Sequence, residues 1–138
     1  MTKGSFNAKI SAEFTPPKTW RLVKQLSFKT HLLTRDDIKI LKEIGVNIAD
    51  TGRITCKVGM RTDLASVPRA VWGIISPWDV ARAAVIHDHL YASLRSYYHS
   101  DGMNKDTWRK ARKLSDKLFL WGMQSAQPFV KKYKIYPA

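Results

Sequence analysis

The stretch that decides the fold is Asp79-Val-Ala-Arg-Ala-Ala-Val-Ile-His-Asp-His-Leu-Tyr-Ala-Ser-Leu94. Its apolar and aromatic positions recur every three or four residues, as they do on one face of an α-helix. The residues that fall at this spacing are Val80, Ala83, Ala84, His87, Leu90, Tyr91 and Leu94. The pattern therefore predicts a long helix from Asp79 to about Leu94.

A second amphipathic segment follows, after a polar and aromatic connection at residues 95–103. Asn104 is a good N-cap residue, and the helical pattern continues to about Met123. One face of this segment carries Trp108, Ala111, Ser115, Leu118 and Gly122. The sequence thus predicts a second long helix with its cationic side chains on the remaining faces.

The N-terminal half favours strands. Residues 5–14 partly alternate apolar and polar side chains, and residues 20–30 and 54–58 are two further strand candidates. Between them, a short helix is expected to start at Thr34, a capping residue, and to stop at Gly45. The expected fold class is α+β, with a small antiparallel sheet packed on two long C-terminal helices.

Length and composition fit a single domain over residues 1–138, with 44% apolar and 25% charged residues. Cys56 is the only cysteine and cannot form an intramolecular disulfide. Residues 1–9 lack the apolar core of a signal peptide, and no apolar run approaches the roughly 20 residues of a membrane span. The expected location is the cytoplasm of the producing cell.

The chain is strongly basic, with a formal net charge of +13. Residues 103–138 hold nine Lys and Arg against two Asp, so the excess is greatest at the C-terminal end, which includes a basic tail at 124–138. Such a field attracts nucleic acid, anionic lipid or an acidic protein, or it is simply a solvated surface. The side chains expected to bind an anionic partner are Arg69, Arg109, Lys110, Lys113, Lys117, Lys131 and Lys132.

His87 is the best candidate for a catalytic group. Tyr91 lies four residues later on the same helical face, whereas Asp88 points about 100° away. Asp116 on the second helix can cross to orient His87, or can pair with Arg112 one turn earlier. These groups form either a general-base centre or a polar network that locks the helices together.

A divalent cation is the cofactor considered for this site. Asp63, in the segment Thr62-Asp-Leu-Ala-Ser-Val-Pro-Arg69, could bind a cation together with Asp88. The other interpretation is that these Thr, Asp and Ser side chains bond their own backbone and fix a tight loop. The chain has no glycine-rich phosphate loop, no G-x-S-x-G and no H-E-x-x-H motif.

The segments Thr62–Arg69, Ala84–Tyr91 and Arg112–Phe119 together resemble a family of tailed phages and prophages, catalogued as domain of unknown function 1353. The resemblance covers about residues 54–125. It implies a phage-encoded protein made in the cytoplasm of a bacterial host. Such a protein would be a minor virion part in the tail or neck, or a host-directed accessory protein.

Ala84-x-x-His-Asp-x-Leu-Tyr91 is also similar to the His-Asp helix of secreted phospholipases A2. This similarity implies that His87 is a base, that Asp88 binds calcium, and that Asp116 on an antiparallel helix orients His87. The disulfides and the glycine-rich calcium loop of that family are absent, so the similarity concerns a site and not a fold.

Two functions therefore stay open. The sequence slightly favours a non-enzymatic virion or accessory protein that binds an anionic partner, because no nucleophile or oxyanion hole is evident. The alternative is a small hydrolase of lipid, cell wall or nucleic acid, with His87, Asp116 and Tyr91 as catalytic residues and a metal-assisted mechanism. Whether the polar residues line an open cleft or a closed core discriminates between them.

Overall fold

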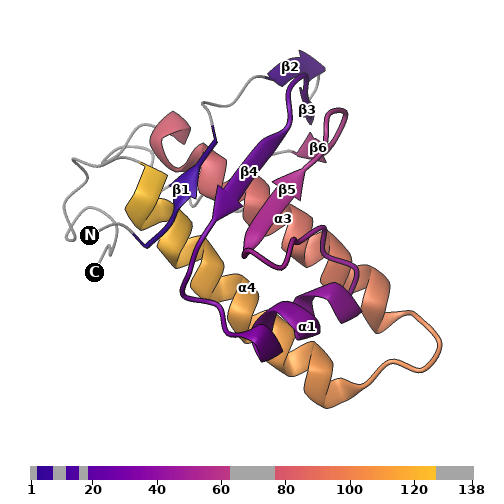
Figure 1. The fold of residues 1–138 in the computed structure, drawn as a ribbon. Helices are drawn as coiled ribbons and strands as arrows, with labels where there is room; N and C mark the ends of the chain where they lie inside the picture. Colours follow the sequence, from indigo (N-terminus) through magenta and orange to yellow (C-terminus); the bar gives the residue numbers. More distant parts are fainter. Residues whose placement is uncertain (1–2, 8–11, 16–18, 63–76, 127–138) are drawn as a thin grey trace, which may run out of the picture.

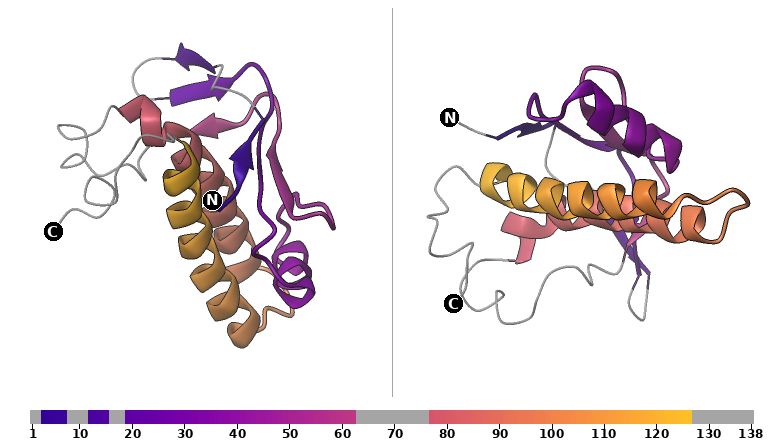
Figure 2. Two further views of the ribbon diagram at one scale, coloured as in Figure 1. Left: turned by 60° about the vertical axis from the view of Figure 1, so that its left-hand side comes forward. Right: turned by 90° about the horizontal axis from the view of Figure 1, so that it is seen from below.

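Two long helices form the framework of the fold. The computed structural model describes residues 3–7, 12–15, 19–62 and 77–126. Helices α3 (Pro77–Tyr98) and α4 (Lys105–Ala126) lie side by side and run in opposite directions (Figures 1 and 2). The Oδ1 atom of Asn104 accepts hydrogen bonds from the backbone N–H groups of Asp106 and Thr107, at 2.9 and 3.1 Å. The predicted N-cap of the second helix is therefore confirmed.

The strands form two small antiparallel sheets. The first has the order β1-β4-β5, and the second has the order β2-β3-β6. Their strands are β1 (Ser5–Phe6), β2 (Ala12–Thr15), β3 (Thr19–Leu22), β4 (Leu26–Lys29), β5 (Arg53–Cys56) and β6 (Arg61–Thr62). The structure thus confirms the α+β class, with a strand-rich N-terminal half and two C-terminal helices.

The strand boundaries differ from the sequence pattern. The segments 5–14 and 20–30, each expected to be one strand, each contribute to two strands in different sheets. The chain leaves the second sheet after Leu22, whose backbone N–H bonds the Met60 carbonyl at 2.9 Å. The alternation of apolar and polar residues is interrupted at Val23-Lys24-Gln25, between β3 and β4, and the prediction of one strand over residues 20–30 runs through this interruption.

Helix α1 (Arg35–Glu43) begins and ends as its sequence predicts. Thr34 Oγ1 accepts from the Asp37 backbone N–H, and Asp37 Oδ2 accepts from the Thr34 N–H, so both halves of a capping box are present. Gly45 follows with φ 95°, a conformation that favours glycine. In Figure 2, α1 lies near the end of the helix pair where α3 connects to α4.

The main core lies between the β1-β4-β5 sheet and the helix pair. Helix α3 contacts α4 as well as strands β4 and β5, so it is covered on more than one side. The consecutive residues Ala83, Ala84, Val85 and Ile86 are accordingly all buried. Within the described residues, no helix combines the length and apolarity needed to cross a bilayer.

Candidate functional site

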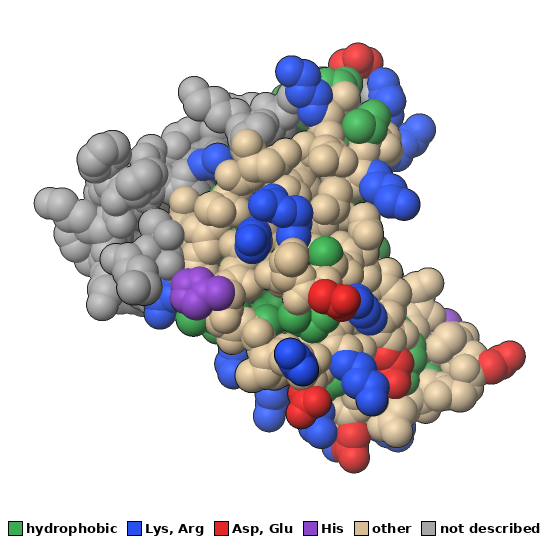
Figure 3. Space-filling model, viewed as in Figure 1, with side chains coloured by type: hydrophobic (Ala, Val, Ile, Leu, Met, Phe, Trp, Pro, Cys, Tyr) green, Lys and Arg blue, Asp and Glu red, His purple; other side chains and the backbone are tan. Residues whose placement is uncertain are grey.

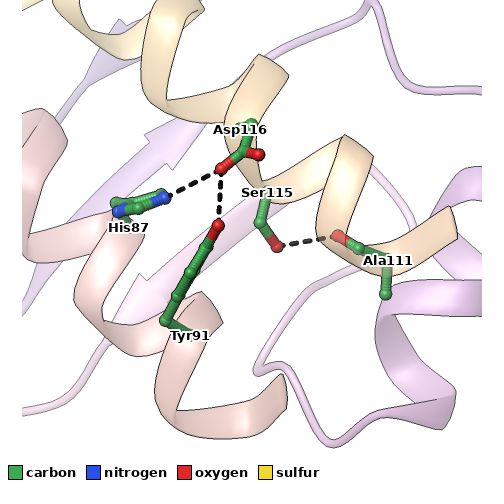
Figure 4. Close-up of polar contacts among 5 residues, drawn as sticks. All are labelled: His87, Tyr91, Ala111, Ser115 and Asp116. Carbon is green, nitrogen blue, oxygen red and sulfur yellow. Dashed lines mark hydrogen bonds and ion pairs between the residues drawn. The ribbon is translucent and has the colours of Figure 1, made fainter. Parts of the chain in front are cut away.

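The polar residues expected to form a catalytic centre meet where α3 and α4 face each other. His87 Nε2 lies 3.3 Å from Asp116 Oδ1, and the Tyr91 hydroxyl donates to the same oxygen at 2.8 Å (Figure 4). His87 and Tyr91 are one turn apart on α3, while Asp116 comes from α4. The three residues therefore form a compact cluster, which we call the His87 cluster.

Aromatic rings hold the His87 imidazole in place. The Phe119 ring stacks on it with centroids 4.6 Å apart and an interplanar angle of 21°, and the Tyr91 ring lies 4.2 Å away. The His87 side chain is 11% exposed, whereas that of Asp116 is 56% exposed. The cluster is thus at the rim of the helix pair, with an accessible carboxylate, and not inside a closed core.

The Asp116 carboxylate selects one tautomer of the ring. An ionised carboxylate can only accept hydrogen bonds, so Nε2 must carry the hydrogen that faces Asp116. In the neutral ring, Nδ1 then carries the basic lone pair. Figure 4 shows this second nitrogen directed away from Asp116.

Tyr91 remains a hydrogen-bond donor in this arrangement. Burial, followed by the hydrogen bond to Asp116 and its negative charge, raises the pKa of the Tyr91 hydroxyl, while the Arg112 guanidinium opposes this effect. The phenol therefore stays protonated at neutral pH and helps to position the carboxylate. Asp116 turns to α3 in this structure, as the orienting hypothesis requires.

Asp88 faces another part of the fold. Its Oδ2 atom accepts a hydrogen bond from the Thr62 hydroxyl at the end of β6. Asp63 is the next residue in the chain but lies outside the described residues, as do residues 64–76. Among the residues that the structure describes, no group of three or more His, Cys, Asp or Glu could hold a metal ion. The cation site of Asp63 and Asp88 therefore stays a prediction.

The cationic residues of α4 project into solvent. Arg109, Lys110, Lys113 and Lys117 are all exposed. The other expected binding residues, Arg69, Lys131 and Lys132, lie outside the described part of the chain. Figure 3 shows Lys and Arg side chains spread over the visible face and not gathered in one patch. The positive field is accordingly broad.

Neither of two alternative nucleophiles is accessible. Cys56 is buried, and burial, aided by the charge of Asp88, raises the pKa of its thiol to about 12. Ser115 is fully buried, and its hydroxyl donates to the Ala111 carbonyl of its own helix at 2.8 Å (Figure 4). Neither side chain can therefore attack a substrate in this structure.

Sequence reasoning missed a hollow between the C-terminal half of α3 and the N-terminal half of α4. Its volume is about 470 Å³. It is lined by Tyr91, Leu94, Arg95, Tyr98, His99, Trp108 and Arg112. The available signal was the aromatic content of residues 95–103, which the pattern assigned to a connection and which is partly the last turn of α3.

Comparison with known proteins gives one family. Residues 38–137 match the model of the family described as "Protein of unknown function (DUF1353)". The match begins within α1, contains the whole His87 cluster, and extends beyond the expected range of 54–125 at both ends. No curated protein and no solved structure matches the chain.

Proposed function

The chain belongs to the DUF1353 family, and from that premise we propose that it is a small hydrolase in which His87 acts as a general base on water. One observation carries the proposal. A histidine on α3 lies 3.3 Å from a carboxylate on the antiparallel helix α4, and a tyrosine holds that same carboxylate oxygen. This is the arrangement that fixes a tautomer and stabilises an imidazolium.

Each group has a defined role in the reaction. His87 takes a proton from a water molecule as the water oxygen attacks the electrophilic carbon or phosphorus of the substrate. The Asp116 carboxylate stabilises the positive charge that develops on the ring. The leaving oxygen then receives the proton from His87, which returns to its neutral form. Tyr91 keeps Asp116 in position through its 2.8 Å hydrogen bond.

A purely structural network explains the cluster less well. Asp116 is 56% exposed, and exposed ion pairs stabilise proteins by only about 0–1 kcal/mol. The two helices are already held by a continuous apolar contact that includes Leu90, Ala111 and Leu118. Stability therefore gains little from placing a histidine and a carboxylate at this rim.

The proposal includes a divalent cation bound by the acidic residues Asp63 and Asp88. Asp88 is held at Thr62, next in the chain to Asp63, and carboxylate oxygens suit hard cations such as Ca²⁺. Asp88 and Asp63 would hold the ion, which would supply charge stabilisation to an anionic substrate. The proposed substrate class is accordingly an anionic ester of lipid, cell wall or nucleic acid.

The test is hydrolysis by wild type and by His87→Gln. The substrates are phosphatidylglycerol vesicles, teichoic-acid-containing cell wall and single-stranded DNA and RNA, each with Ca²⁺ and with chelator. We expect one class to be hydrolysed and His87→Gln to lower the rate by about 10² to 10⁴. Asp116→Asn should also lower the rate and change its pH profile. The exposed residues His31 and Asp101 provide matched His→Gln and Asp→Asn controls.

Two results would overturn the proposal. One is equal hydrolysis by wild type and a folded His87→Gln variant. The other is the absence of hydrolysis of all three classes by wild type under both metal conditions. Circular dichroism of each variant establishes that a loss of rate is not a loss of fold.

The second candidate is a non-enzymatic phage protein that binds an anionic partner, as a minor virion component or as an accessory protein in the host cytoplasm. The four exposed cations Arg109, Lys110, Lys113 and Lys117 on α4 favour it. Mass spectrometry of purified particles tests the virion version. If the protein is found in purified particles and the wild type hydrolyses none of the three substrate classes, the virion role is the better assignment.

A further inference from the structure

The hollow beside the His87 cluster has no role in the proposed hydrolysis. It lies between α3 and α4, and its volume of about 470 Å³ is within the usual range for small-ligand sites. Tyr91 is the residue that it shares with the cluster. The remaining walls come from the last turns of α3 and the first turns of α4.

One wall of the hollow is fixed and another is accessible. The Trp108 indole N–H donates to the Leu94 carbonyl at 3.2 Å, which anchors this ring between the two helices. The Tyr98 ring meets Trp108 edge-on, with centroids 5.5 Å apart, and the Tyr98 residue is 49% exposed. Tyr98 therefore presents an accessible ring on a firm support, where a planar group can stack.

The charged residues at the hollow are both arginines. The Arg112 guanidinium carbon lies 5.8 Å from the centre of the Trp108 ring, and Arg95 is exposed on α3. No residue that lines the hollow is acidic, and Asp116 accepts a hydrogen bond from the lining residue Tyr91. Guanidinium groups bind phosphate oxygens with two parallel hydrogen bonds.

We propose that this hollow binds a nucleotide unit of single-stranded nucleic acid. The base stacks on Tyr98, and the flanking phosphates bind Arg95 and Arg112. Aromatic platforms beside cationic groups are the usual means of binding single strands without base readout. The net charge of +13 adds the long-range attraction. This binding does not require that the chain be a hydrolase.

A lipid surface fits the same hollow less well. Membrane docking needs a contiguous exposed apolar face. The large hydrophobic residues that are exposed in the described part of the chain are Val23, Leu32, Val58 and Tyr98, and only Tyr98 lines the hollow. An acidic peptide would satisfy the arginines but would leave the accessible ring of Tyr98 without a stacking partner.

The test is fluorescence anisotropy of a labelled 12-nucleotide oligothymidine, titrated with wild type and variants. Tyr98→Ala should weaken binding about 5- to 150-fold, the range expected for loss of one base–aromatic stack, while Tyr98→Phe should keep it. Arg95→Gln should weaken binding and lower the slope of log K against log salt by about 0.7. Lys24→Gln removes the same charge from an exposed site outside the hollow and should bind within twofold of wild type.

The inference fails if folded Tyr98→Ala and Arg95→Gln bind the oligonucleotide as tightly as Lys24→Gln does. It also fails if anionic vesicles, and not the oligonucleotide, show the dependence on Tyr98. Repeating the titration in the His87→Gln background prevents cleavage of the probe. It also separates the two proposals, because that variant should be inactive yet retain binding.

Discussion

Three consecutive residues of α3 serve three different parts of the fold. His87 contacts Asp116 on α4, Asp88 accepts a hydrogen bond from Thr62, and His89 Nε2 accepts one from the Asn47 backbone N–H at 3.2 Å. An α-helix turns about 100° per residue, so adjacent side chains must diverge. A single turn of α3 thus connects the second helix, a sheet and the segment before β5.

His89 should make the stability of the protein depend on pH. Burial lowers the pKa of His89 from its ordinary value of 6.5, and its neutral ring accepts a hydrogen bond from Asn47. Below pH 6.5, His89 is protonated in the unfolded chain but less readily in the folded chain, because its folded-state pKa is lower. The contribution of His89 to stability is therefore fully present above about pH 6.5 and is lost as the pH falls below it. Between pH 7.5 and pH 5.5, protonation of His89 can lower the free energy of unfolding by at most about 1.4 kcal/mol.

Urea unfolding at pH 7.5 and pH 5.5 measures this effect. His89→Gln keeps a hydrogen-bond acceptor without the titrating ring, so its free energy of unfolding should fall less than that of wild type. The free energy of unfolding of His31→Gln, a change at an exposed position, should fall as much as that of wild type. An equal fall in His89→Gln and wild type would assign the pH dependence to other groups.

At the residue scale, the sequence predicts the face of the helix on which a side chain lies but not the residue that it contacts. The four-residue spacing was enough to place His87 and Tyr91 on one face of α3. The partners of Asp88 and His89 lie 26 and 42 residues away in the chain, and no local pattern specifies such contacts. The contact with Asp116 depends on how α4 is aligned against α3. Helical periodicity left open whether Asp116 crosses to His87 or pairs with Arg112, and the similarity to the phospholipase A2 helix implied the first.

At the scale of elements, α3 and α4 approach each other closely at Gly122. A β-carbon built on Gly122 would lie 3.0 Å from the Ala83 β-carbon and 3.5 Å from Cζ of Phe6. Both positions are therefore occupied by small residues because the helix backbones approach each other closely there. This contact sets the alignment that also brings Asp116 to His87.

Gly122→Leu should destabilise the protein by about 1–3 kcal/mol, because the added side chain has no space between the helices. Lys117→Leu introduces the same side chain on an exposed face of α4 and should change stability by about 0.5 kcal/mol or less. Chemical denaturation compares the two variants. Equal stability of the two would mean that the helices separate at Gly122 at little energetic cost.

The helices could be predicted better than the strands for a physical reason. A pattern that repeats over about 20 residues identifies α3 and α4, and a capping box marks the start of α1. The strands in the described part of the chain have only two to four residues each. At that length an alternating pattern covers at most two pairs of positions, so the interruption at Val23-Lys24-Gln25 did not by itself identify a change of sheet after Leu22.

At the scale of the whole molecule, the sheet and the helix pair bury one thiol between them. Cys56 is at the end of β5, is 1% exposed, and its Sγ lies 3.9 Å from the Val85 carbonyl of α3. Its position makes it a probe of the contact between these two layers. A reagent can reach the thiol only when β5 and α3 separate.

Cys56 should therefore react with a thiol reagent only when the protein unfolds and the sheet separates from the helix pair. Burial raises its pKa to about 12, so the folded state also lacks the reactive thiolate at neutral pH. We expect labelling to be slower than for an exposed thiol, introduced as Ser100→Cys, by a factor on the order of 10³ or more. Increasing urea should accelerate the labelling of Cys56 with the same dependence as global unfolding. Labelling that is fast and independent of urea would instead show that β5 separates from α3 while the rest of the fold persists.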